Sequence, residues 1–178
     1  AISLAHRDLL YLGLNCATGP EQMTDHIRAL SELCNTRVAC VPNAGLPNED
    51  GLYDETPKML GDALSRFIED GWLNVIGGCC GTTPEHIEYL ADLAATARPR
   101  QLPQHHRSFY SGIDWVEATE ENRPLLVGER TNVIGSRRFK RLVVSGEWEE
   151  ATEIGVAQVK KGAHIVDVKS SARSAGRA

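Results

Sequence analysis

Two adjacent cysteines are the residues of this sequence best suited to metal or nucleophile chemistry. Cys79 and Cys80 lie in the segment Gly-Gly-Cys-Cys-Gly-Thr at residues 77–82. An apolar run at 73–76 precedes this segment and a helix-start signal at 83–85 follows it, so the thiols lie where a strand passes into a helix. Adjacent side chains of a regular strand point to opposite faces, and both thiols can face one ion only if the backbone bends, which the flanking glycines permit. The nearby helix N-terminus favours thiolates, but the pair lacks a third ligand.

The elements that must position these thiols form a pattern that repeats three times within residues 1–97. Apolar runs at 9–14, 37–41 and 73–76 predict strands, and each is followed by a loop and by a helix that opens near a proline. Three such units predict parallel strands joined by crossovers. All three strands then end on the same side of the sheet, which carries the site in α/β folds.

A third thiol follows the first predicted strand. Cys16 therefore shares an edge of the sheet with Cys79 and Cys80, although 63 positions separate it from the nearer of the two. Three thiolates around one ion leave a tetrahedral zinc with an open fourth position, which is the arrangement of a catalytic site. Asn43 ends the second strand, and its amide oxygen is predicted to take that position when substrate is absent. A vicinal cysteine pair without metal is the alternative.

The remainder of the chain predicts a second, separate unit. Residues 98–123 show little periodicity, contain a pair of histidines at 105 and 106, and predict a linker. A second unit then begins with a strand at residue 125, which runs into Gly-Glu-Arg-Thr-Asn-Val-Ile-Gly-Ser at 128–136. A short basic segment at 137–143, a helix at 147–161 and a second strand at 164–168 follow. Residues 169–178 are polar, of low complexity, and predict an unfolded tail.

Composition narrows the class of protein. The chain has 178 residues, of which 42% are hydrophobic and 24% charged. No stretch approaches the roughly 20 apolar residues of a membrane span, and no signal peptide is visible, so we expect a cytoplasmic protein without a membrane partner. Five cysteines, an odd number, favour free or metal-bound thiols over disulfides.

The charge is unevenly distributed between the two halves. Residues 1–97 carry 5 Lys and Arg against 14 Asp and Glu, a balance of −9, whereas residues 98–178 carry 14 against 10, a balance of +4. This asymmetry fits two domains with different ligands. No basic stripe interleaved with aromatic residues is present, so we do not expect a nucleic-acid partner.

Three motifs together resemble one protein family. Gly-Leu-Asn-Cys at 13–16, Pro-Asn-Ala-Gly-Leu-Pro at 42–47 and the segment at 77–87 are similar to the homocysteine-binding barrel of the cobalamin-dependent methionine synthase family. The segment at 128–136 resembles the opening of that family's folate-binding barrel. The Gly-Gly-Cys-Cys-Gly motif alone would indicate only a homocysteine methyltransferase of some kind, and the segment at 128–136 selects the cobalamin-dependent type.

The resemblance implies an α/β fragment that spans the junction of two (β/α)8 barrels. Residues 1–97 would be the C-terminal part of the homocysteine-binding barrel, 98–123 the interdomain linker, 124–168 the N-terminal part of the pterin-binding barrel, and 169–178 a tail that departs from the family pattern. Three strands cannot close an eight-stranded barrel, so we expect uncovered apolar faces and little activity from this chain alone.

The resemblance also implies a reaction and its cofactors. Cys16, Cys79 and Cys80 would bind Zn²⁺, with the homocysteine thiol in the fourth position, and methyl transfer would give methionine. The methyl donor would be methylcobalamin, held by a cobalamin-binding domain absent from this chain and recharged from 5-methyltetrahydrofolate. Glu129 and Asn132, placed at the C-terminal end of their strand, correspond to residues lining the pterin site.

The sequence leaves two other functions open. One is a betaine- or S-methylmethionine-dependent homocysteine methyltransferase, and another is a non-catalytic module with structural zinc. Cys34 and Cys40 are expected to be inert buried thiols. The basic residues at 137–141 are expected to form a solvated face.

Overall fold

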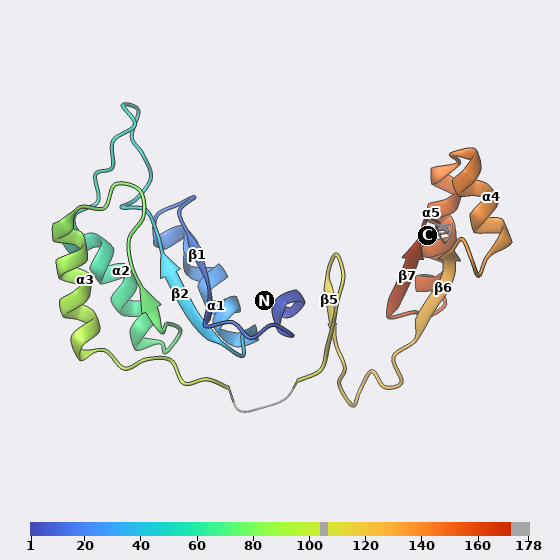
Figure 1. The fold of residues 1–178 in the computed structure, drawn as a ribbon, viewed down its shortest axis with the longest axis horizontal. Coiled ribbons are helices and arrows are strands. Elements are labelled where there is room, and N and C mark those ends of the chain that lie inside the picture. Colours follow the sequence, from blue (N-terminus) through green and yellow to red (C-terminus); the bar gives the residue numbers. More distant parts are fainter. Residues whose placement is uncertain (104–106, 172–178) are drawn as a thin grey trace, which may run out of the picture. The chain divides into compact units, whose positions relative to one another are not determined.

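The computed structural model describes residues 1–103 and 107–171, in two compact units, Ala1–His106 and Arg107–Ala178 (Figure 1). Unit 1 holds the cysteine motifs and unit 2 holds the segment at 128–136. The histidine pair at 105 and 106 and most of the predicted tail, residues 172–178, lie outside the described residues.

A three-stranded parallel sheet forms the centre of unit 1, as the sequence pattern predicts. Its strands are β1 (Tyr11–Asn15), β2 (Arg37–Val41) and β3 (Val75–Ile76), in the order β1-β2-β3. β1 pairs with β2 along its whole length, and β2 pairs with β3 at two positions. All three carboxyl ends therefore lie on one side of the sheet.

β3 is shorter than the predicted strand at 73–76 because a side chain replaces part of the ladder. The Asn74 N–H donates to the Val38 carbonyl at 2.9 Å, and the Asn74 side-chain oxygen accepts the Val38 N–H at 3.0 Å. The Asn74 amide nitrogen also donates to the Arg100 carbonyl at 2.8 Å. Residue 74 is thus held beside β2 without regular strand geometry.

Three helices follow the three strands of unit 1. They are α1 (Thr24–Leu33), preceded by the 3-10 turn η2 (Glu21–Met23), α2 (Pro57–Glu69) and α3 (Pro84–Thr96). α2 begins where the Thr56 side chain accepts the Met59 N–H, with proline at the first helical position. The apolar residues within 1–9 favour the tail of a helix, but the structure has only the 3-10 turn η1 (Ile2–Leu4) in this segment.

The core of unit 1 lies between the central strand and the helices. Its fully buried side chains come from α1, β2 and α2, and include Ile27, Val38, Leu60, Leu64 and Phe67. Cys34 and Cys40 are buried in this cluster, as expected of inert thiols.

The apolar spacing of Ile87, Leu90 and Leu93 predicts that all three face inward from α3, and for Ile87 this prediction is wrong. Ile87 is 47% exposed, whereas His86 beside it is buried at 5%. His86 Nδ1 accepts the Thr83 N–H at 3.1 Å, and Nε2 donates to the Glu55 carbonyl at 2.9 Å. Because both ring nitrogens have hydrogen-bond partners, the imidazole can be buried on the inward side of α3, where the apolar pattern predicts Ile87.

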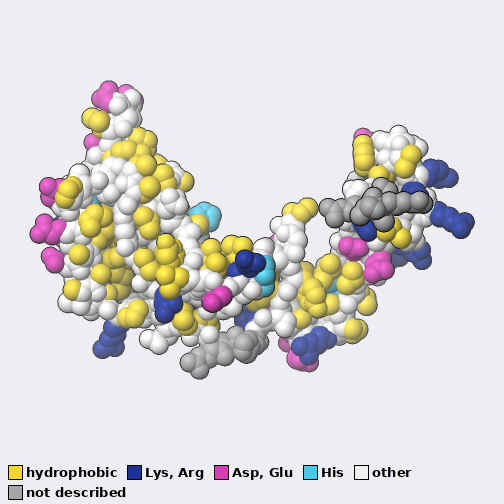
Figure 2. Space-filling view, viewed as in Figure 1, with side chains coloured by type: hydrophobic (Ala, Val, Ile, Leu, Met, Phe, Trp, Pro, Cys, Tyr) yellow, Lys and Arg dark blue, Asp and Glu magenta, His cyan; other side chains and the backbone are white. Residues whose placement is uncertain are grey.

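Apolar surface remains exposed on unit 1. Figure 2 shows hydrophobic side chains spread over the surface of this unit. Leu10 and Tyr11, at the open edge of the sheet beside β1, are 71% and 52% exposed. Val75 on the opposite edge strand is also exposed. This agrees with the expectation that three strands leave apolar faces uncovered.

Unit 2 contains a hairpin within the segment predicted to be a linker. β4 (Phe109–Ser111) pairs antiparallel with β5 (Trp115–Glu117). The Arg107 guanidinium donates two hydrogen bonds to the Glu117 carboxylate, at 2.6 and 2.7 Å. The same guanidinium lies 4.9 Å from the centre of the Phe109 ring. These contacts stabilise strands of only three residues.

The rest of unit 2 is a strand–helix–helix–strand segment. β6 (Val127–Asn132) and β7 (Ile165–Lys169) are parallel and are connected by α4 (Arg137–Ser145) and α5 (Trp148–Lys160). The basic segment is a helix because the Ser136 side chain caps its start and Gly146, in the left-handed conformation, ends it. β7 extends to Lys169, one residue into the predicted tail.

The described residues thus form α/β units with sheets of three, two and two strands, none of which closes into a barrel. The α/β class is confirmed, and membership of two barrels stays a prediction. Within the part of the chain that the structure describes, no helix is both long and apolar enough to cross a membrane.

Candidate metal centre

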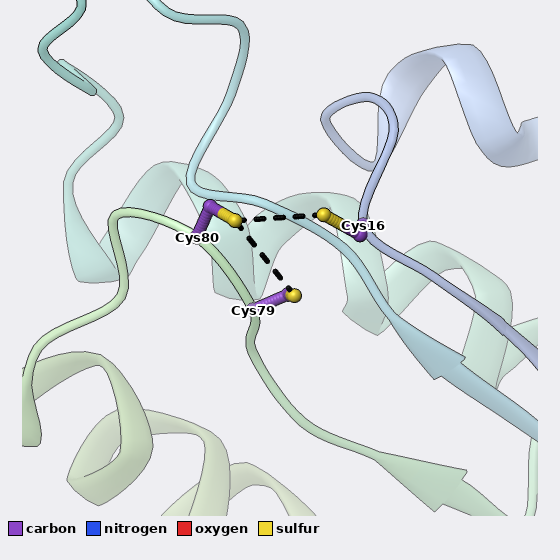
Figure 3. A group of neighbouring side chains, drawn as sticks. All are labelled: Cys16, Cys79 and Cys80. Atoms are coloured by element: carbon purple, nitrogen blue, oxygen red, sulfur yellow. Dashed lines mark hydrogen bonds between the residues drawn. The ribbon is translucent and has the colours of Figure 1, made fainter.

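Three cysteine sulfurs gather at the carboxyl side of the unit 1 sheet. Cys16 Sγ lies 3.5 Å from Cys80 Sγ, and Cys79 Sγ lies 4.0 Å from Cys80 Sγ. All three sulfurs lie within 4.8 Å of one another. Figure 3 shows the side chains pointing toward one another, Cys16 from the loop after β1 and the other two from the loop after β3. The structure thus brings together the thiols that the strand ends predict to converge.

The backbone at Cys16 is strained in a way that aims its side chain. Cys16 and Ala17 have φ angles of 59° and 61°, a left-handed conformation that non-glycine residues rarely adopt. Such residues cost on the order of 1–3 kcal/mol each and persist only where surrounding contacts hold them. Here the Cys16 N–H donates to the Val41 carbonyl at 3.0 Å, and the Thr18 N–H donates to the Cys16 carbonyl at 2.7 Å.

The turn that carries Cys79 and Cys80 is anchored to the loop after β2. The Cys79 N–H donates to the Pro42 carbonyl at 2.7 Å, and the Cys80 carbonyl accepts the Ala44 N–H at 2.9 Å. Gly81, with φ of 78°, completes the turn. The backbone therefore leaves the extended conformation, so that adjacent side chains can face one centre.

Asn43 links this turn to the first strand's loop. Its side chain is 3% exposed, and its oxygen accepts the Cys80 N–H at 3.1 Å. The backbone N–H of Asn43 donates to the Thr18 carbonyl at 3.1 Å. The amide oxygen that the sequence pattern offers as a stand-in ligand is therefore engaged with the backbone of a neighbouring cysteine.

Electrostatics distinguishes the sulfurs. Hydrogen bonds from the Ala17 N–H, and then from Cys80 and Cys79, lower the pKa of the Cys16 thiol. Hydrogen bonding to Cys16 and Cys79, together with the like charge they would carry, raises the pKa of Cys80. Three thiolates so close together repel one another, so full ionisation of the group needs a cation among them.

The geometry fits one soft divalent ion. With Zn–S bonds of about 2.3 Å, tetrahedral coordination separates two ligand sulfurs by about 3.8 Å. The distances of 3.5 and 4.0 Å are close to that value. Cys80 is exposed and the other two cysteines are half-buried, so a fourth ligand can approach from solvent. Three thiolates with one open position are the donor set of a catalytic site.

A tyrosine that the sequence pattern did not single out borders the sulfurs. Tyr53 is half-buried, and desolvation, together with the negative charge of Cys80, Cys16 and Cys79 as thiolates, raises the pKa of its phenol. A hydrogen bond with Cys80 also contributes to that shift. The one sequence signal for this residue is that it is the single aromatic side chain of the loop at residues 42–56.

The two residues predicted to line a pterin site lie in unit 2. Asn132 ends β6, as predicted, and its side-chain oxygen accepts the Ile134 N–H at 2.9 Å. Glu129 is exposed and lies within an irregularity of the β6–β7 pairing, between Gly128 and Thr131, three residues before the strand ends. Its predicted place at the strand's C-terminal end is therefore wrong, because the bulged strand continues past it.

Comparison with known families identifies the relationship of unit 1. The family model for homocysteine S-methyltransferase matches residues 1–94. The match includes Cys16, Asn43, Cys79 and Cys80, together with all of the unit 1 sheet.

Proposed function

The chain belongs to the homocysteine S-methyltransferase family, and on that premise we propose that Cys16, Cys79 and Cys80 hold a zinc ion at which the thiol of homocysteine is methylated to give methionine. The observation that carries the proposal is the placing of three sulfurs within 4.8 Å of one another, on a side open to solvent. Family membership implies the substrate and the transferred group, and the cysteine cluster supplies the means of activating that substrate.

The chemistry required is activation of a thiol that is mostly protonated at neutral pH. Zinc held by three thiolates, when bound, stabilises a fourth thiolate while the charge of its protein ligands keeps that sulfur nucleophilic. The homocysteine thiol would release its proton to solvent and its sulfur would attack the methyl carbon of the donor. The new S–C bond would form from the sulfur's electron pair as the donor–methyl bond breaks, and the electron pair of the broken bond would stay with the donor.

The protein's own residues keep the three ligand sulfurs in place for this step. The strained turn at Cys16, the backbone bonds of Cys79 and the Asn43 side chain on Cys80 fix the three sulfurs before substrate arrives. A preorganised ligand set loses little freedom when the substrate thiol binds. Asn43 thus acts in our proposal as a positioning residue beside the substrate thiol.

For the methyl donor we propose methylcobalamin, recharged from 5-methyltetrahydrofolate. Support comes from the segment at 128–136, which resembles the start of a pterin-binding barrel. Its first five residues lie on β6, which forms a parallel pair with β7 as such a barrel requires. Glu129 and Asn132 are the proposed pterin contacts, since a carboxylate and an amide can pair with the polar edge of that ring. Cobalamin is assigned to a domain other than these two units.

A betaine- or S-methylmethionine-dependent enzyme is the second candidate, because the family match covers residues 1–94 and leaves the donor open. A non-catalytic zinc module is disfavoured, because structural zinc sites take four protein ligands and the described residues supply three here.

The test is a metal analysis followed by a titration with homocysteine. We expect one zinc per chain, and release of about one proton when homocysteine binds, since its thiol must ionise. Methionine, which has no thiol, is the matched control ligand and should release none. Zinc that ignores homocysteine would indicate a structural site. Methyl transfer from betaine or S-methylmethionine, and not from methylcobalamin, would replace the proposed donor.

A further inference from the structure

The loop at residues 42–56, between β2 and α2, is organised by its own hydrogen bonds. Figure 1 shows it projecting from the sheet after β2. Pro47 and Tyr53 form an antiparallel bridge across it. The Asn48 side chain accepts the N–H groups of Asp50 and Leu52, at 3.0 and 2.9 Å, and donates to the Asp54 carboxylate at 3.0 Å. These bonds fix where the loop returns toward the sheet, and Tyr53 lies at that return.

The aromatic ring of Tyr53 packs on the backbone of the cysteine turn. A Cβ placed on Gly81 would lie 2.3 Å from both Cβ and Cγ of Tyr53, which is too close for any real side chain. Gly81 also has φ of 78°, which favours glycine for a second reason. The ring therefore lies directly against the residue that follows Cys80, where only a glycine leaves room for it.

The hydroxyl end of the same side chain reaches the sulfurs. Tyr53 hydrogen-bonds Cys80 and lies within the electrostatic influence of Cys16 and Cys79. A phenol is ordinarily neutral at neutral pH, so its O–H can be donated to a thiolate, which has acceptor capacity only. A neutral donor in this position partly offsets the charge of a ligand sulfur without adding a positive charge.

We propose that Tyr53 is a positioning residue of the three-sulfur site, whose ring holds the Gly81 turn in place and whose hydroxyl donates a hydrogen bond to Cys80 Sγ. The inference deepens the proposed function and rests on it for the identity of the ion. Two consequences follow. Loss of the ring loosens the turn that aims Cys79 and Cys80, whereas loss of the hydroxyl alone leaves the fold unchanged but removes the contact that orients Cys80 Sγ toward the ion and adjusts its electron donation.

The experiment uses the full chain loaded with Co²⁺ as a spectroscopic stand-in for zinc. Tyr53→Phe removes the hydroxyl and keeps the ring, Tyr53→Ala removes both, and Tyr110→Phe on β4 is the matched control, since Tyr110 is 55% exposed and lies in unit 2. Metal affinity is measured by competition with a chelator, and the sulfur-to-cobalt charge-transfer band reports the donor strength of the thiolates.

We expect Tyr53→Phe to move the charge-transfer band and to weaken metal binding about tenfold, the lower end of the effect of removing a hydrogen-bond partner from a metal ligand. Tyr53→Ala should weaken binding further, and Tyr110→Phe should match the unaltered chain. A Tyr53→Phe protein with unchanged affinity and an unchanged band would overturn the inference, even if Tyr53→Ala fails to fold.

The outcomes separate this inference from the proposed function. Cobalt that binds and responds to Tyr53→Phe, but not to homocysteine, would overturn the proposed function and leave the role of Tyr53 standing. A response to homocysteine without a response to Tyr53→Phe would do the reverse. Failure of the unaltered chain to bind cobalt would overturn both.

Discussion

The side-chain oxygen of Asn43 accepts the backbone N–H of Cys80 at 3.1 Å, across 37 positions of sequence. Asn43 is buried and follows β2, whereas Cys80 follows β3, so the bond ties the loops of two neighbouring strands together. Because the Asn43 side chain makes this hydrogen bond, a substitution at residue 43 removes it and leaves all three cysteine sulfurs in the chain.

Asn43→Ala should therefore weaken the site without removing a thiol. An unsatisfied buried N–H costs about 1–3 kcal/mol, and we expect a loss of stability of that size and weaker zinc binding. Urea denaturation and chelator competition measure the two effects. Asn122→Ala is the matched control, because Asn122 accepts the Thr119 N–H at 2.8 Å in unit 2 and should change zinc affinity not at all.

Cys16→Ser should abolish stoichiometric zinc. The substitution removes one of three soft ligands, and a serine hydroxyl is not ionised at neutral pH, so the remaining pair at 79 and 80 cannot complete the site. Metal content after dialysis provides the measurement. Cys34→Ser removes a buried thiol outside the cluster and should keep the zinc. Full zinc retention by Cys16→Ser would count against the convergence of the three sulfurs on one ion.

Gly81→Ala should destabilise the chain more than Gly51→Ala does. Both glycines have positive φ, 78° and 77°, and share that strain, but a Cβ at Gly81 meets the Tyr53 ring whereas one at Gly51 meets nothing within 4 Å. We expect an excess cost of about 1–3 kcal/mol for Gly81→Ala, in the range of an overpacking penalty.

The excess should disappear when the whole Tyr53 side chain, Cβ included, is removed. In a double-mutant cycle, Gly81→Ala introduced into the Tyr53→Gly chain should cost no more than Gly51→Ala, because the Cβ and ring atoms of Tyr53 that meet the new side chain are gone and only the backbone strain is left. Additive effects of the two substitutions, measured by urea denaturation, would mean that the ring and the glycine do not constrain each other.

The sequence pattern anticipates the three-sulfur cluster but not its surroundings. Cys16, Cys79 and Cys80 could be placed together because parallel strands end on one side of a sheet, which is a property of topology alone. Tyr53 could not, because its position depends on the path of a loop that the Asn48 side chain fixes through three hydrogen bonds. Loop paths set by single polar side chains leave no periodic signal.

Two further differences have similar causes. His86 is buried in place of Ile87 because both ring nitrogens are hydrogen-bonded, and hydrophobic periodicity takes no account of satisfied polar groups. The sequence pattern does not predict the β4–β5 hairpin, because strands of three residues are too short to show alternation of apolar and polar residues. Its stability rests on the Arg107–Glu117 pair, two residues ten positions apart.

Arg100→Ala should destabilise unit 1. Arg100 is 6% exposed, and its guanidinium donates to the carbonyls of Ser31, Cys34 and Thr36, at 2.6 to 3.2 Å, around the C-terminal end of α1. Removing it leaves several backbone acceptors unsatisfied, and we expect a cost of about 3 kcal/mol in urea denaturation. Arg98→Ala, at an exposed position, should lie within about 0.5 kcal/mol of the unaltered chain.

Cys40 should make stability fall at high pH. Its thiol is buried against Met23, with the two sulfurs 3.9 Å apart, and burial raises the pKa of Cys40 from 9.0 to about 12. The folded pKa lies above the unfolded value, so the stabilising effect is complete below pH 9 and is lost as pH rises from 9 toward 12. Each pH unit in that window should cost about 1.4 kcal/mol.

Cys40→Ala is the comparison protein. It lowers stability below pH 9 by opening a cavity, and the difference between it and the unaltered chain should shrink steadily above pH 9. Urea denaturation of both proteins at pH 8 and pH 10.5 measures that difference, and other groups that titrate in the same window cancel because both chains carry them. A difference that stays constant between the two pH values would mean that the Cys40 thiol ionises as readily in the folded chain as in the unfolded one.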